Sequence, residues 1–176
     1  MRHLIKRRVL FFGLIISVMI GLSVFTFGTV FAAGELGLGL TAVDTDGNPI
    51  SSVQSGDIIE YIIDYSCADL TDGCGTLDIQ FTLDLSLVEF VEVITSPSYD
   101  GSYSAPTVFV TNDPVINPSF DGGESAQARV RVRVLDGLDG SETIPATVIG
   151  RVNNGVDPPN STEIIANSPA IDVLAQ

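Results

Sequence analysis

Downstream of Arg8 the chain contains no lysine and no histidine, because Lys6 and His3 are its only representatives of these residue types. Ser-His-Asp and Cys-His sites need a histidine, and isopeptide crosslinks between lysine and asparagine need a lysine. A zinc site built on histidine is excluded for the same reason. Tryptophan is also absent, so the chain lacks the ring best suited to stacking on a sugar. We therefore expect no catalytic residues and no enzymatic activity.

Basic residues are concentrated at the N-terminus. Arg2, Lys6, Arg7 and Arg8 precede an uncharged, mostly apolar run over residues 9–33 that ends in short side chains. These are the parts of a secretory signal peptide. The run also has roughly the 20 residues that can cross a bilayer, so an uncleaved membrane anchor is the alternative. We expect residues 1–33 to be this segment and residues 34–176 to be one exported domain, secreted or displayed at the cell surface.

Acidic residues dominate the predicted exported domain. All 22 lie at or after Glu35, where only Arg129, Arg131, Arg133 and Arg151 are basic, which gives a net charge of −18. Such a chain repels nucleic acid and anionic headgroups. We expect no nucleic-acid partner, and membrane contact only through the N-terminal segment. Solubility is the simplest interpretation of the charge, and cation binding or a salty habitat are the alternatives.

Cysteine occurs twice, as Cys67 and Cys74. An even cysteine count in an exported chain indicates a disulfide. The bridge would close a short loop between two predicted strands, as a local clamp on a turn and not as a link across the core. Two thiols without a histidine make a poor zinc shell, so we prefer the disulfide to a metal site.

Short runs of alternating apolar and polar residues fill the rest of the domain, with Gly, Asp, Asn and Pro between them. This alternation predicts half-buried strands. The predicted strands cover residues 36–43, 57–66, 76–84, 87–94, 107–111, 126–135, 143–152 and 164–173, the last with a kink at Pro169. No segment has a convincing helical pattern. Spacing of this kind is typical of an antiparallel β-sandwich.

Several of these segments together resemble a known domain. Residues 55–67 (SGDIIEYIIDYSC), 73–93 (GCGTLDIQFTLDLSLVEFVEV), 120–134 (FDGGESAQARVRVRV) and 143–173 are similar to the conserved repeat domain of unknown function of bacterial and archaeal surface proteins. Residues 77–93 also bear a weaker resemblance to cohesin and carbohydrate-module sandwiches. The first resemblance implies structural or adhesive roles without catalytic residues.

This resemblance also refines the expected fold. The alternating runs number about 7–9 strands, and the resemblance implies that this all-β chain folds as an immunoglobulin-like antiparallel β-sandwich. The hydrophobic signal helix is expected to precede the sandwich at the N-terminus.

Arg129, Arg131 and Arg133 are spaced two apart and share one face of a predicted strand. We expect this face to be exposed and paired with acidic side chains of a neighbouring strand, with Glu60 and Asp64 as partners. Cross-strand pairs of opposite charge are favourable. The alternative is a binding site for an anion or an acidic glycan, because arginine suits carboxylates.

Asp44, Asp46 and Asn48 in the segment DTDGNP resemble the start of a calcium-binding loop, where spaced oxygen atoms coordinate the ion. The distal glutamate and the two helices of an EF-hand are missing. A turn between strands is the simpler interpretation, since Asp, Asn and Gly favour turns.

The sequence thus predicts a secreted or cell-surface structural or adhesive module without catalytic activity. Its expected partners are other extracellular or surface proteins, including further copies of itself. The alternative is a small glycan-binding or calcium-binding module, and calcium is the one cofactor considered.

Overall fold

The computed structural model of this chain describes residues 30–31, 36–68, 70, 73–153 and 162–175. The predicted signal peptide or anchor lies outside these residues except for Val30 and Phe31. Within the described ranges the regular elements are thirteen strands. None of these residues forms a helix that is long and apolar enough to cross a membrane.

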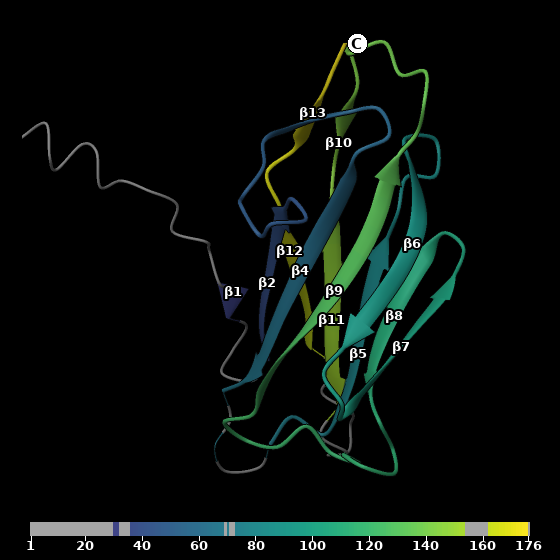
Figure 1. Cartoon of the computed structure of the whole chain (residues 1–176). Helices are drawn as coiled ribbons and strands as arrows, with labels where there is room; N and C mark the ends of the chain where they lie inside the picture. Colours follow the sequence, from purple (N-terminus) through teal and green to yellow (C-terminus); the bar gives the residue numbers. More distant parts are fainter. Residues whose placement is uncertain (1–29, 32–35, 69, 71–72, 154–161, 176) are drawn as a thin grey trace, which may run out of the picture.

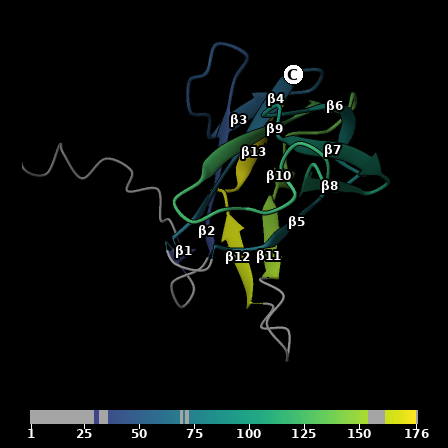
Figure 2. The same cartoon turned by 90° about the horizontal axis from the view of Figure 1, so that it is seen from below.

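Two five-stranded sheets form the body of the molecule, and every neighbouring pair within them is antiparallel. The first sheet has the order β1 (Val30–Phe31), β2 (Leu36–Val43), β4 (Ile58–Cys67), β9 (Ser125–Val134), β6 (Val88–Thr95). The second has the order β12 (Thr162–Asn167), β11 (Thr147–Asn153), β5 (Thr76–Thr82), β8 (Thr107–Asn112), β7 (Tyr99–Ser104). Figure 2 shows the two sheets as separate layers viewed along the strands.

A small third sheet closes one end of the sandwich. It contains β10 (Thr143–Ile144), β13 (Ile171–Leu174) and β3 (Ser52–Gln54), and β13 runs parallel to β3. This end also carries the C-terminus, at the top of Figure 1.

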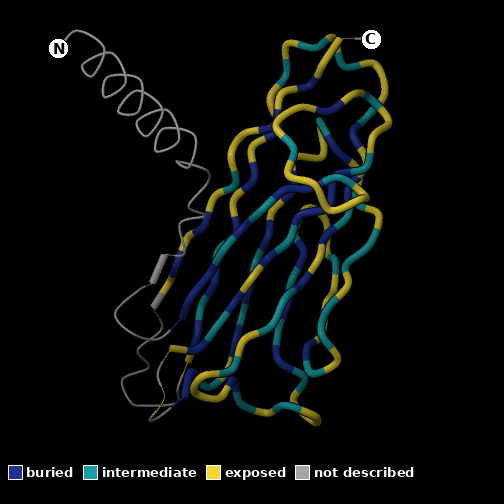
Figure 3. The backbone as a smooth tube through the Cα atoms, turned by 60° about the vertical axis from the view of Figure 1, so that its left-hand side comes forward, coloured by how far each residue is buried: buried dark blue, intermediate teal, exposed yellow. Residues whose placement is uncertain are grey.

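The hydrophobic core fills the space between the two large sheets. Along β4, Ile59, Tyr61, Ile63 and Tyr65 are all buried, while Asp64 on the opposite face is exposed. Other strands show the same period of two, visible in Figure 3 as buried residues alternating with less buried ones. Every buried residue of this core lies between Leu36 and Val173. Among the residues whose burial is described, the core therefore lies within the predicted exported domain.

The strand order confirms the predicted sandwich. In an immunoglobulin constant domain the two sheets contain strands ABED and CFG. Here β2, β4, β9 and β6 occupy the places of A, B, E and D, and β5, β11 and β12 those of C, F and G. The β7–β8 hairpin is an addition beside β5.

Two details of the predicted strands are wrong. The predicted total of about 7–9 strands is too low, because short strands such as β3 and β10 carry too few residues to show alternation. The strand predicted over residues 143–152 is divided into β10 and β11 at Pro145, which has no backbone N–H for a ladder. The last predicted strand is likewise interrupted near Pro169, where a kink was expected.

Candidate functional site

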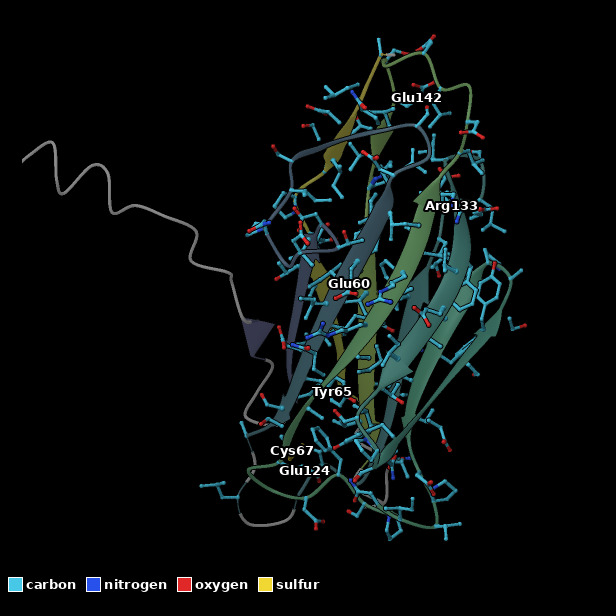
Figure 4. The ribbon with its side chains drawn as sticks, viewed as in Figure 1. Glu60, Tyr65, Cys67, Glu124, Arg133 and Glu142 are labelled. Atoms are coloured by element: carbon cyan, nitrogen blue, oxygen red, sulfur yellow. A yellow bond between two sulfur atoms is a disulfide. The ribbon has the colours of Figure 1, made fainter. Side chains whose placement is uncertain are left out.

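An Arg–Glu ladder covers the outer face of the first sheet. It consists of Glu60 on β4, Arg129, Arg131 and Arg133 on β9, and Glu89 and Glu92 on β6. The strand register places Glu60 and Glu92 on either side of Arg131, and Glu89 beside Arg133. Figure 4 shows Glu60 and Arg133 on this face.

Glu60 lies at the centre of the ladder and is only 4% exposed. Its Oε1 accepts a hydrogen bond from Nη1 of Arg129 at 3.0 Å, and its Oε2 accepts one from Nε of Arg131 at 2.6 Å. Arg131 also donates to Glu92 at 2.6 Å. Hydrogen bonds to Glu60 and Glu92 raise the pKa of Arg131 above its usual value. A buried carboxylate needs such partners, because an unpaired buried charge is strongly unfavourable.

The remaining arginines of the described residues are paired as well. Arg133 lies 3.3 Å from Glu89, and Arg151 on the second sheet lies 2.8 Å from Glu163 and 3.6 Å from Asp78. The expected pairing with Glu60 is therefore confirmed for Arg129 and Arg131, whereas Arg133 pairs with Glu89 instead. Their role in binding an anion or acidic glycan stays a prediction, and such a ligand would compete with carboxylates already bound to these guanidinium groups.

Asp64 was expected to pair with an arginine, and this detail is wrong. Its Oδ1 accepts a hydrogen bond from Nε2 of Gln127 at 2.9 Å, and Oε1 of Gln127 accepts one from Nε of Arg129 at 3.1 Å. The strand register explains the difference, because Asp64 lies opposite Gln127 on β9. The glutamine thus connects Asp64 to the ladder.

A shallow depression of about 440 Å³ lies beside Asp64 on the same face. Side chains that line it include Asp64, Ser66, Ser96, Ser125 and Gln127. Hydroxyl, amide and carboxylate groups in a shallow depression provide hydrogen-bond partners for a polar ligand.

The predicted disulfide between Cys67 and Cys74 is confirmed. Cys67 is the last residue of β4 in the first sheet, and Cys74 lies two residues before the start of β5 in the second. Both residues are buried and belong to the core. The bridge therefore ties the two sheets together within the core at this end. The expectation that it only clamps a turn is wrong, because the chain crosses from one sheet to the other between the two cysteines.

A hydrogen-bonded cluster at the disulfide end was missed in the sequence. Oε1 of Glu124 accepts hydrogen bonds from the hydroxyl of Tyr99 at 2.5 Å and from Nδ2 of Asn117 at 2.8 Å. Its backbone oxygen accepts one from the N–H of Cys67 at 2.8 Å. Burial, and then the bond to Glu124, raise the pKa of Tyr99. No spacing signal links these residues, since they come from separate loops and strands.

Asp44 organises its own turn. Its Oδ1 accepts hydrogen bonds from the N–H groups of Asp46 at 2.9 Å and Asn48 at 2.8 Å. Hydrogen bonds from Asn48 are the main reason that the pKa of Asp44 is lowered. Within the described residues no group of three or more His, Cys, Asp or Glu side chains is placed to hold a metal ion. Calcium binding at Asp44, Asp46 and Asn48 stays a prediction.

Comparison with known proteins shows a likeness of fold. No family model and no curated protein sequence matches the chain. The major pilin subunit BcpA of Bacillus cereus is similar in structure, with a TM-score of 0.59 and 14% identity over 81% of this chain and 41% of that one. The C-terminal domain of the AgI/II polypeptide BspA of Streptococcus agalactiae has a TM-score of 0.57 and 10% identity over 78% of this chain and 49% of that one.

The chain therefore spans less than half the length of these two structures. A cohesin of Acetivibrio cellulolyticus scaffoldin B has a TM-score of 0.48, which is too low to support an argument. The resemblance to cohesins remains an interpretation of the sequence. At these identities the comparisons establish a shared β-sandwich fold.

Proposed function

We propose that this chain is a secreted or surface-displayed module with a structural or adhesive role, acting through contacts with other proteins and without catalysis. The observation that carries the proposal is the strand arrangement shared with a major pilin subunit over 81% of the chain. A pilin subunit is a structural component of a surface fibre, and we extend that class of role to this module.

Chemistry along the chain supports an extracellular location. The basic and apolar residues 1–33 have the character of an export signal. The bridge between Cys67 and Cys74 is of a kind that persists in oxidising compartments and is rare in the cytosol. A net charge of −18 after residue 33 favours solubility.

The outer face of the first sheet is the surface best suited to a protein partner. Three arginines and three glutamates of the ladder balance one another, whereas the domain as a whole is strongly acidic. An approaching acidic surface is therefore repelled less by this face than by the rest of the molecule.

Cell fractionation tests the proposal in the organism that carries the gene. We expect an antibody against the domain to detect it in the medium or on intact cells, and deletion of the gene to reduce surface attachment or change a surface layer. Detection only in the cytosol, with no surface phenotype on deletion, would contradict a structural or adhesive role outside the cell.

A small ligand-binding module is the second candidate, favoured by the shallow depression beside Asp64, which hydroxyl, amide and carboxylate groups line. Glycan-array binding that is lost in Asp64→Asn, and kept in Asp84→Asn on a separate turn, would support it. Calcium calorimetry with Asp44→Asn tests the other ligand. If the protein binds no glycan and releases no heat with calcium, the structural role is the better account.

A further inference from the structure

Four strands form the outer edges of the two large sheets once β1 is set aside, and three of them carry negative charge. These are β6 with Glu89 and Glu92, β7 with Asp100, and β12 with Glu163. β6 also has a register irregularity between Phe90 and Glu92. Charges and bulges on edge strands are common devices against pairing with another chain. The fourth edge, β2, has the sequence LGLGLTAV and no charge at all.

The β2 edge is covered by its own chain at both ends. Val30 and Phe31 of β1 pair with Leu38 and Gly37. At the other end the N–H of Ile50 donates to the carbonyl oxygen of Ala42 at 3.2 Å. Pro49 forms a bridge with the neighbouring Val43. Figure 1 shows β1 at the outer edge of the first sheet, beside β2.

Only one of the two segments that cover the β2 edge remains after the leader is removed. Pro49 and Ile50 belong to the sandwich domain, whereas β1 lies inside the predicted leader. Removal of residues 1–33 takes β1 away and leaves Gly34 and Glu35 before β2. Two residues are too few to turn back and replace a strand, because a hairpin needs a loop of at least two residues in addition to the strand itself.

Backbone direction makes the vacated edge suitable for pairing. The hydrogen bond from Ile50 to Ala42 shows that the backbone of Ala42 faces outward. Because alternate residues of a strand face the same edge, Leu36, Leu38 and Leu40 present their N–H and C=O groups outward too. The stretch from Leu36 to Thr41 is about the usual length of a strand in a globular protein.

We propose that the β2 edge is a self-association site, protected by β1 in the precursor and opened when the leader is removed. A second copy of the chain pairs its own β2 antiparallel to the first and extends the sheet across a two-fold axis. This inference rests on the proposed structural role and names the contact by which the module assembles.

The distribution of charge makes β2 the edge strand at which a second copy is opposed least. In an antiparallel pairing of two identical strands, like charges placed opposite each other are destabilising. Pairing β6, β7 or β12 with its own copy brings carboxylates together, whereas β2 has none. The two molecules still repel each other as a whole at −18 each, so added salt strengthens the association.

Light scattering and sedimentation velocity on two forms of the protein test the proposal. Residues 34–176 contain every core residue of the described part of the chain. They are compared with residues 28–176, which keep β1. We expect the shorter chain to reach twice the monomer mass as its concentration rises, and the longer chain to remain monomeric. A shorter chain that stays monomeric at all concentrations and salt levels would overturn the proposal.

The variant Gly39→Lys in the shorter chain tests whether the two copies pair through β2. Gly39 lies opposite Asp64, and a Cβ added there meets its nearest atom at 3.7 Å, so the lysine fits and pairs with a carboxylate of its own fold. A lysine on an edge strand opposes pairing, and we expect a monomer with unchanged thermal stability. Gly39→Ala should still dimerise, as should Ile165→Lys on the exposed face of β12.

A dimer that survives Gly39→Lys but is lost in Ile165→Lys would place the contact on β12 and refute the β2 assignment. Surface location is measured independently by fractionation. A monomeric shorter chain found on the cell surface would therefore reject this inference and leave the proposed function standing.

Discussion

Glu60 illustrates how a charged residue on a sheet face becomes part of the stable structure. Its carboxylate is 4% exposed and bonded to both Arg129 and Arg131, whereas Glu89 meets Arg133 with both side chains about half exposed. Exposed ion pairs contribute little to stability, while a buried carboxylate depends on its partners. The two glutamates of one ladder therefore have different energetic roles.

Replacing Glu60 with glutamine removes the charge at nearly constant size. We expect the free energy of unfolding to fall by about 1–3 kcal/mol, because two charge-assisted hydrogen bonds at a buried site are weakened. The matched change Glu89→Gln should cost less than about 1 kcal/mol. Urea unfolding of both variants measures the difference, and equal losses would show that Glu60 is no more than a surface partner.

The tyrosines of the core also differ from one another, because only some of their hydroxyl groups have a hydrogen-bond partner. The buried hydroxyl of Tyr61 has no hydrogen-bond partner in the described structure, whereas that of Tyr99 donates to Glu124. We expect Tyr61→Phe to leave stability unchanged or raise it by up to about 1 kcal/mol, and Tyr99→Phe to lower it by about 1–3 kcal/mol. Thermal unfolding distinguishes them, and a loss in Tyr61→Phe as large as that in Tyr99→Phe would contradict the assignment.

At the scale of elements, β2 and β9 were predictable because their sequences alternate with a period of two, and β4 because every second residue from Ile59 to Tyr65 is apolar. Residues 36–43 were predicted as a strand and form β2 with those bounds. The polar strand β7 was not predicted, since its residues YDGSYS show no apolar face and its pairing with β8 depends on tertiary structure.

Parts of the candidate site could be inferred for the same reason. The spacing of Arg129 and Arg131 and a neighbouring acidic strand predicted their contact with Glu60. Glu124 and Tyr99 are joined only by the closure of loops in space, which leaves no periodic signal in the sequence.

The disulfide joins β4 to the segment before β5, so its removal should destabilise the contact between the two sheets. We expect the double variant Cys67→Ser and Cys74→Ser to lose about 2.5 kcal/mol of unfolding free energy, from the loop closed by the bridge, and more where a buried serine lacks a partner. Denaturant unfolding of this variant measures the loss. An undiminished midpoint in the double variant, or in the reduced native chain, would show that packing alone holds this end together.

At the scale of the whole molecule, three core tyrosines make stability depend on alkaline pH. Burial raises the pKa of Tyr61, Tyr65 and Tyr99. Below about pH 10, the ordinary pKa of an unfolded tyrosine, all three are protonated in both states and their contribution is fully present. Above it the unfolded chain releases protons more readily than the folded chain, so stability falls.

Thermal unfolding followed from about pH 8 to pH 12 checks this dependence. We expect the midpoint to fall above about pH 10, and to fall less steeply in Tyr61→Phe, which lacks one of the three groups. A flat profile, or an equal slope in the variant, would contradict the role of these tyrosines.

The central claim is that this sandwich works outside the cell, and intact-mass spectrometry after thiol labelling tests it most directly. The chain recovered from the medium or cell surface of its source organism should begin at Gly34, or at Met1 if the segment is kept as an anchor, and should take up no label at Cys67 or Cys74. A chain found only in the cytosol, beginning at Met1 and labelled at both cysteines, would contradict the account.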